Sequence, residues 1–314
     1  MSSIMKKFFI AASAAGMSAI AQAPSFAYTI TGNNDVLLYD NNYGSCGATS
    51  TCLTNDMSRL DAILAGNSSA PGGNVELFAS SEQLTKDQFL ASNARTNIEG
   101  TVAGKSLTLS SLTATDWFGP TLNTAYGVNN FANTWFNAFY DASGLAANEG
   151  AIKAALQLPS FLPSSALRQL AYINFLDDQV KGFQRSSDPN ISYVTTSGSD
   201  LLIGLAGHFD AKAFYASQLG PFASFINNGF QVSEVVKVNY GGIERFLYSF
   251  NATRSGLVNN SGLGNDGLSH TGNYEVALRG VVPPSASVPE PSVVFGLIGL
   301  GGLLAAKRKQ QQAG

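Results

Sequence analysis

The stretch LNTAYGVNNFANTWFNAFYDA, residues 122–142, decides the fold class, because the apolar pattern of the chain changes its period there. Within it Val128, Phe131, Trp135 and Phe139 recur at intervals of three or four residues. That spacing places the four side chains on one face of a helix. A face this rich in aromatic rings is typical of a protein core, so we interpret it as buried and not as a platform for stacking sugars.

Two more helices are predicted downstream. The first covers residues 148–158 and is closed by Pro159, which cannot continue a helix. The second covers residues 164–184, with Gly182 near its end. The residues expected to face inward on this second helix are Leu170, Ile173, Val180 and Phe183. Since all three helices are amphipathic, we expect them to bury against a common surface.

Strand patterns lie on both sides of this helical centre, with β-branched and aromatic residues in partial alternation. The predicted strands before the helices are 28–32, 35–39, 75–80 and 104–115, and those after them are 191–196, 200–209, 230–241, 244–252 and 273–282. Shorter helices are predicted at 56–66, 86–92 and 212–228, and residues 201–207 could equally begin a buried helix. The predicted class is α+β, with β-strands at both ends of the body around a central group of about three amphipathic helices.

The first 27 residues have the organisation of a secretory signal peptide. Lys6 and Lys7 precede a short apolar run at residues 8–23, and Ser25 and Ala27 supply the small residues that signal peptidase recognises. The run is short and rich in small residues for a permanent span, which needs about 20 apolar residues. We therefore expect signal peptidase to cut after Ala27.

The last 28 residues combine three features in a fixed order. A Pro-Glu-Pro triplet, Pro289, Glu290 and Pro291, comes first, and an uninterrupted apolar run at residues 293–306 follows it. As a helix this run would extend roughly 21 Å, at ~1.5 Å per residue. The basic residues that follow at once are Lys307, Arg308 and Lys309. The positive-inside rule places such a cluster in the cytoplasm.

This ordered combination closely resembles the PEP-CTERM sorting signal of Gram-negative bacteria that make extracellular polysaccharide. The resemblance covers only about the last 28 residues. It implies that a membrane-embedded exosortase cuts near the Pro-Glu-Pro triplet and that Pro289, Glu290 and Pro291 are its recognition residues. The two prolines also keep the segment extended, so that a protease can reach it. The alternative is an ordinary single-span anchor that is never cut.

These features divide the chain into a signal peptide (1–27), an exported α+β body (28–282), a linker (283–288) and a sorting signal (289–314). Charged residues make up only 12% of the chain, about half the usual quarter. Removal of both ends leaves 13 basic and 20 acidic residues, a net charge of −7. That balance argues against nucleic acid and against anionic lipid as partners.

The chain has two cysteines, Cys46 and Cys52, in a loop rich in Gly, Ser and Thr. In an exported protein two such neighbours form a disulfide. The alternative is half of a zinc site, but zinc would need two more ligands, and His208 and His270 are the only histidines in the chain. We therefore predict a disulfide that fixes a loop, and no metal or cofactor.

The strongest candidates for catalysis are Asp200, His208 and Asp210. An exported hydrolase could use His208 as a base with a carboxylate to orient it, but the chain has no Gly-x-Ser-x-Gly elbow to provide a nucleophile. A metal site from His208, Asp210 and His270 would need two distant loops to meet. A calcium loop around Asn265 and Asp266 lacks the ordered acids of an EF-hand.

The sequence therefore favours a non-enzymatic surface or matrix protein. It would be held briefly at the inner membrane by its C-terminal helix, and then sorted by exosortase to the cell surface or the extracellular matrix. Extracellular polysaccharide is the expected partner, through the amides and hydroxyls that replace charge on the surface. The alternative is an exported hydrolase that acts on polysaccharide or peptide and uses His208.

Overall fold

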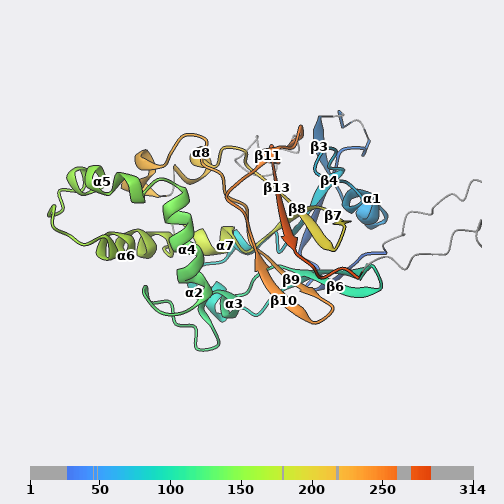
Figure 1. Cartoon of the computed structure of the whole chain (residues 1–314), viewed down its shortest axis with the longest axis horizontal. Helices are drawn as coiled ribbons and strands as arrows, with labels where there is room; N and C mark the ends of the chain where they lie inside the picture. The colour runs from blue at the N-terminus through green and yellow to red at the C-terminus, as the bar shows by residue number, and fades with distance from the viewer. Residues whose placement is uncertain are drawn as a thin grey trace, which may run out of the picture.

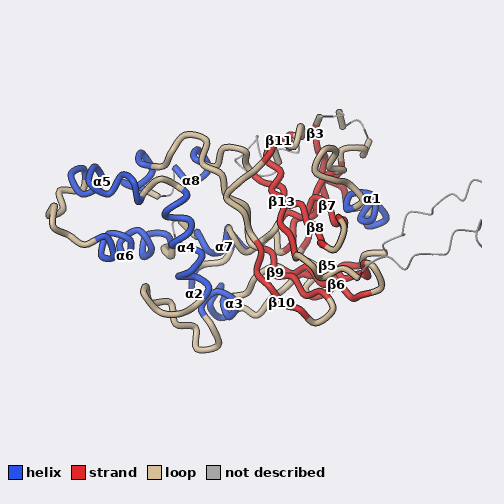
Figure 2. The backbone as a smooth tube through the Cα atoms, in the orientation of Figure 1, coloured by secondary structure: helices blue, strands red, loops and turns tan. Residues whose placement is uncertain are grey.

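The structure, a computed structural model, describes residues 27–44, 46–47, 49–178, 180–216, 219–259 and 270–283. The predicted signal peptide up to residue 26 and the sorting signal lie outside the described residues, as do Asn265 and Asp266. Figure 1 shows that the body has two ends of different character, with most helices gathered at one end and the strands, together with α1 (Leu60–Leu64), at the other. Figure 2 shows the same separation by secondary structure.

The larger sheet has eight strands. In spatial order they are β11 (Thr253–Arg254), β13 (Gly272–Leu278), β8 (Asp200–Gly207), β7 (Asn190–Ser197), β4 (Gly73–Leu77), β2 (Val36–Asp40), β3 (Ser50–Thr54) and β12 (Val258–Asn259). Neighbouring strands are antiparallel except β3 and β12, which run parallel. Leu201, Ile203 and Leu205 alternate on one face of β8 and are buried, which confirms residues 201–207 as a strand.

The smaller sheet has five antiparallel strands. In spatial order they are β1 (Thr29–Gly32), β5 (Thr96–Val102), β6 (Lys105–Ser110), β9 (Val236–Tyr240) and β10 (Ile243–Leu247). Both sheets contribute to one apolar cluster with α1 (Leu60–Leu64), which follows the short 3-10 turn η1 (Met57–Arg59). We call it the β cluster, and its members include Leu38, Leu64, Val75, Ile98, Leu109, Ile203 and Val238.

The other end of the body is built from short helices around an aromatic core. They are η2 (Ser81–Gln83), α2 (Lys86–Ala91), α3 (Ala114–Phe118), α4 (Phe131–Ala142), η3 (Ala146–Asn148), α5 (Glu149–Ala155), α6 (Ser164–Phe175), α7 (Gly182–Arg185), α8 (Lys212–Ala216) and η4 (Gly220–Phe225). We call the core the helical cluster, and its fully buried rings include Trp117, Trp135, Phe136, Phe139, Tyr172, Phe175 and Phe183. Aromatic pairs of this kind contribute about 0.5–1.5 kcal/mol each beyond the area they bury.

The helix predicted around the aromatic stripe is α4. It begins at Phe131, because the side chain of Asn130 accepts a hydrogen bond from the backbone N–H of Asn133 and so caps the helix. Trp135 and Phe139 are buried as predicted. Val128 lies before the helix and is partly buried. The aromatic stripe is therefore core.

The helix predicted over 164–184 is wrong in extent and in orientation. The chain leaves the helix after Phe175 and starts again as α7 at Gly182, preceded by Lys181 in a left-handed conformation. Leu170 and Ile173 are 43% and 56% exposed instead of buried. The residues of α6 that face the core are Leu167, Ala171, Tyr172 and Phe175. The two aromatic rings bury more surface than the two aliphatic side chains, and they set the orientation of the helix.

Gly182 starts a helix and does not end one. A Cβ at this position would lie 2.2 Å from the ring of Phe175, so only glycine lets α7 approach α6 this closely. Val180 and Phe183 are buried as predicted, but they lie after the end of α6, Val180 just before α7 and Phe183 within it. Of the other strands and α-helices, β3, β5, β11, β12 and α3 were not predicted, and the strand within 230–241 is confined to β9.

The two ends of the described body lie near the hairpin between β5 and β6. Tyr28, next to the first described residue, packs against Gly100 of β5, where an added Cβ would come within 2.6 Å of the tyrosine ring. At the other end the amino group of Lys105 donates to the carbonyl of Val281 at 2.8 Å. Figure 1 shows α5 and α6 at the opposite end of the body. Among the residues that the structure describes, no helix is long and apolar enough to cross a membrane.

Candidate functional site

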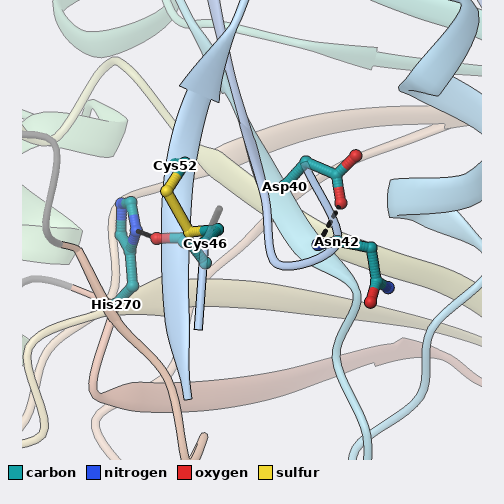
Figure 3. Close-up of a disulfide and its surroundings, with 6 residues drawn as sticks. Asp40, Asn42, Cys46, Cys52 and His270 are labelled. Carbon is teal, nitrogen blue, oxygen red and sulfur yellow. Dashed lines mark hydrogen bonds between the residues drawn. A yellow bond between two sulfur atoms is a disulfide. The ribbon is translucent and has the colours of Figure 1, made fainter. Parts of the chain in front are cut away.

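A disulfide joins Cys46 and Cys52, as predicted. Cys46 lies in the loop between β2 and β3, and Cys52 lies within β3, where the sequence had predicted only loop. Figure 3 shows the disulfide between His270 and the turn that holds Asp40 and Asn42. His270 is buried, and its Nδ1 lies 3.0 Å from the hydroxyl of Thr51.

The turn after β2 is held by a buried carboxylate. Asp40 accepts a hydrogen bond from the backbone N–H of Asn42 at 2.8 Å, and its other oxygen lies 2.5 Å from Nε of Arg59. The side chain of Asn41 donates to the carbonyl of Pro71 at 3.2 Å and accepts from the amide of Asn42 at 2.8 Å. These contacts connect the turn to the loop before β4.

A hollow of about 430 Å³ lies where this turn, α1, the loop before β4 and residues 255–257 meet. Its polar lining comes from Asn41, Asn42, Ser69 and Ser255, and the backbone of Gly72 and Gly256 also lines it. Asn42 and Ser69 are exposed and offer an amide and a hydroxyl to the hollow. No lining residue carries a charge. Such a surface suits a neutral ligand with many hydroxyl groups, whose hydrogen bonds it can exchange for those of water.

The three catalytic candidates do not form one site. Asp200 begins β8 and His208 follows its end, so the strand of eight residues separates them by roughly 25 Å, at ~3.3 Å per residue. Asp200 binds Arg279 at 3.2 Å and the backbone N–H of Gly280 at 2.8 Å. Asp210 accepts from the backbone N–H groups of Lys212 and Gly229. Both carboxylates therefore stabilise turns.

His208 and His270 are closer than the sequence suggested, because β8 and β13 are paired and Gly207 lies opposite Gly272. The two rings nevertheless have different neighbours. The ring of His208 stacks on Phe214 at 4.7 Å between centroids, and that of His270 meets Tyr39 edge-on at 4.7 Å. Within the described ranges, no group of three or more His, Cys, Asp or Glu side chains could hold a metal ion.

Sequence reasoning missed the most unusual charged residue of the body, Asp188. It lies in the stretch SSDPN, which reads as a turn because of its Pro and Asn. In the structure it is only 5% exposed. The hydroxyl of Ser81 donates to its Oδ2 at 2.7 Å, while its Oδ1 has no hydrogen-bond partner among the described residues. The residues that flank it, QRSS before and PN after, are mainly polar and give no signal of this burial.

The hollow that we consider for ligand binding was also not predicted. It is assembled from segments near residues 41, 70 and 256, which are far apart in the sequence. In comparisons with known proteins, the chain matches no protein family, no curated protein and no solved structure. Its function must therefore be inferred from the chemistry of its own residues.

Proposed function

We propose that the chain is an exported protein of the cell surface or extracellular matrix, is processed by exosortase and binds a neutral polysaccharide in the hollow lined by Asn42 and Ser69. The disulfide between Cys46 and Cys52 supports export, because disulfides persist in oxidising compartments such as the periplasm and the exterior. The order of signals at the two ends of the sequence supports sorting through the inner membrane.

The uncharged lining of the hollow is the observation that carries the binding proposal. Amide and hydroxyl groups from three separate segments line the hollow, and the chain as a whole has few charged residues. Tyr43 directly follows Asn42 in the chain and is 42% exposed. An exposed ring next to amides and hydroxyls offers a sugar both a flat apolar contact and hydrogen-bond partners.

Processing is tested by measuring the intact mass of the protein recovered separately from membranes and from the extracellular matrix. We expect a matrix form that begins at Tyr28 and ends near residues 289–291. Glu290→Ala should trap the chain in the membrane fraction, whereas Ser287→Ala, a neighbouring control, should not. A chain that is found only in membranes and still ends at Gly314 would contradict sorting by exosortase.

Binding is tested with the mature protein and neutral polysaccharide purified from the host matrix, by affinity electrophoresis. Asn42→Ala should weaken binding about fivefold, as expected for one lost hydrogen bond of ~1 kcal/mol. Ala62→Trp should block the hollow, because Ala62 is exposed and lines it. The matched control is Ala147→Trp, at an exposed position of η3 outside the hollow.

Two outcomes would contradict the binding proposal. The first is equal retention of Ala62→Trp and Ala147→Trp by the polysaccharide. The second is hydrolysis of polysaccharide or peptide by the mature protein that His208→Ala abolishes, which would favour the alternative, an exported hydrolase. The separation of Asp200 from His208 along β8 gives that alternative less support.

A further inference from the structure

The segment of residues 184–190 joins the helical end of the body to both sheets. Three of its backbone carbonyls accept hydrogen bonds from separate segments. The N–H of Leu77 donates to the carbonyl of Pro189, that of Leu112 to Ser187, and that of Val235 to Ser186. The indole of Trp117 in the helical cluster donates to the hydroxyl of Ser187 at 2.8 Å. We call residues 184–190 the junction segment. It lies between the helical cluster and the β cluster, and it is almost entirely buried.

Asp188 is the acidic residue of the junction segment. Of its two carboxylate oxygens, one accepts from Ser81 and the other has no partner among the described residues. The side-chain amide nitrogen of Gln184, in the same segment, is also buried without a described partner. A buried carboxylate with one neutral donor and no cation is expensive to keep ionised.

The charged groups around Asp188 are mainly acidic. Glu234, before β9, is bound by the backbone N–H of Asn190 at 2.9 Å and by its side-chain amide. Glu76 from β4 and Glu82 from η2 also act on Asp188 electrostatically. The guanidinium of Arg185 in α7 binds Glu82 at 3.1 Å. The phenols of Tyr215 and Tyr274 also interact electrostatically with Glu234.

Burial is the largest cause that raises the pKa of Asp188, and the negative charges of Glu234, Glu82 and Glu76 raise it further. Burial also raises the pKa of Glu234, but the hydrogen bonds from Asn190 oppose that effect. When two such carboxylates interact, the better-solvated partner keeps the charge and the other keeps the proton. Glu234 has the donors, so the proton belongs on Asp188.

We propose that Asp188 is the neutral acid in the folded protein, and that its ionisation as the pH rises loosens the junction segment between the helical cluster and the β cluster. The neutral form needs no cation and removes the repulsion from three neighbouring carboxylates. The ionised form would have to draw in water or move, and the carbonyls of Ser186, Ser187 and Pro189 would move with it. The body then has a proton-dependent connection between its two ends.

The sign of the pH effect follows from the direction of the pKa shift. Unfolded Asp has an ordinary pKa of about 3.9, and in the folded protein the pKa is higher. Between these two values the folded protein binds more protons than the unfolded chain, so stability falls as the pH rises. The effect of Asp188 is thus largest on the alkaline side of its folded pKa and absent below about pH 4.

The test compares thermal unfolding of the mature wild-type protein and the Asp188→Asn variant from pH 4 to pH 9. Between the unfolded and the folded pKa of Asp188, the Tm of the variant minus that of the wild type should grow by roughly 3–5 °C per pH unit. This is the slope expected when the folded protein binds one proton more than the unfolded chain in a domain of this size. Asp87→Asn, at an exposed position of α2, is the matched control and should give no such slope.

Hydrogen exchange provides a second measurement, which needs only the wild-type protein. The amides of Leu77, Leu112 and Val235 should lose protection with rising pH beyond the intrinsic rate, while the amide of Val238 in β9 should not. Infrared spectroscopy of the wild type should also show the carbonyl band of a protonated carboxylic acid at pH values above the ordinary range of Asp and Glu, and Asp188→Asn should lack it.

Three results would overturn the proposal. One is a flat difference in Tm between wild type and Asp188→Asn. Another is a fall of Tm with rising pH that disappears in Glu234→Gln but persists in Asp188→Asn, which would place the proton on Glu234. The last is a rise of the wild-type Tm with added CaCl2 that Asp188→Asn abolishes, since a cation and not a proton would then neutralise the site. The first two results leave the proposed binding in the hollow untouched, because none of these residues lines it.

Discussion

Asp116 and Asp188 are both buried carboxylates, and their surroundings give them opposite behaviour. Asp116, in α3, contacts Arg95 at 2.5 Å and Lys237 at 3.0 Å, and it completes a capping box with Thr113. Burial by itself would raise its pKa, but the backbone N–H of Thr113 and the two cations outweigh that effect and lower the pKa below its ordinary value. Asp188 has no comparable donors.

We predict that Asp116→Asn lowers the free energy of unfolding by about 2 kcal/mol. The reason is that Arg95 loses its carboxylate partner and Lys237 keeps only the more exposed Glu244, at 3.1 Å. Urea denaturation at pH 7 measures this loss. Asp141→Asn is the matched control. The side chain of Asp141 is 59% exposed in its ion pair with Arg168, so its loss should cost at most about 1 kcal/mol. Equal losses in the two variants would mean that Asp116 is better solvated than its neighbours indicate.

The pH dependence of Asp116 is opposite in sign to that of Asp188. Since the folded pKa of Asp116 is lowered, its contribution to stability is present above the unfolded pKa of about 3.9 and is lost as the pH falls through the folded value. The wild-type profile below pH 4 should therefore fall more steeply than that of Asp116→Asn. The two aspartates together predict a maximum of stability on the acidic side of neutrality.

At the scale of elements, α6 provides the clearest test of orientation. Leu167→Ala should lower the free energy of unfolding by about 3 kcal/mol, because the side chain is fully buried in the helical cluster. Ile173→Ala should change it by less than about 0.5 kcal/mol, since the side chain is 56% exposed and alanine favours helix. Urea denaturation of both variants distinguishes the observed orientation from the one that the sequence predicted. A large loss for Ile173→Ala with a small one for Leu167→Ala would contradict the structure.

Elements whose pattern is local were predicted well. The alternation of Leu201, Ile203 and Leu205 indicates β8, and the spacing of Trp135 and Phe139 indicates α4. The inward face of α6 was predicted wrongly, because two apolar stripes compete on that helix and only the packed core decides between them. Strand β5 was missed since its sequence TNIEGTV has few apolar residues, and pairing with β1 and β6 stabilises it.

The same distinction holds for the candidate sites. The pairing of Cys46 with Cys52 needs only six residues of separation and could be predicted. The hollow and the environment of Asp188 could not, because each depends on segments that tertiary structure brings together. His208 and His270 illustrate this limit, since the pairing of β8 with β13 brings their backbones together while packing turns their rings to different neighbours.

At the scale of the whole molecule, the α+β class was predicted, but the order of strands was not. The smaller sheet pairs β6 with β9, which lie on opposite sides of the helical region in the sequence. The segment from α3 to α7 is thus inserted between β6 and β7, and the junction segment is the point at which the chain returns from it to the sheets. The connections from β4 to β5 and from β8 to β9 add η2 with α2 and α8 with η4 to the helical end. Contacts of such long sequence separation favour slow folding.

The location of the two chain ends has a consequence for how the body would stand on a membrane. Tyr28 and Val281 both lie by the hairpin of β5 and β6, and the helices α5 and α6 lie at the opposite end (Figure 1). If the C-terminal segment holds the protein at the membrane before sorting, the strands would be near the lipid. The loop between α5 and α6, which contains the 86% exposed Phe161, would belong to the opposite end of the body. Residues 284–288, which precede the Pro-Glu-Pro triplet, could extend roughly 17 Å, at ~3.4 Å per residue. The part of the body that neighbouring molecules meet first would then be the helical end with α5 and α6.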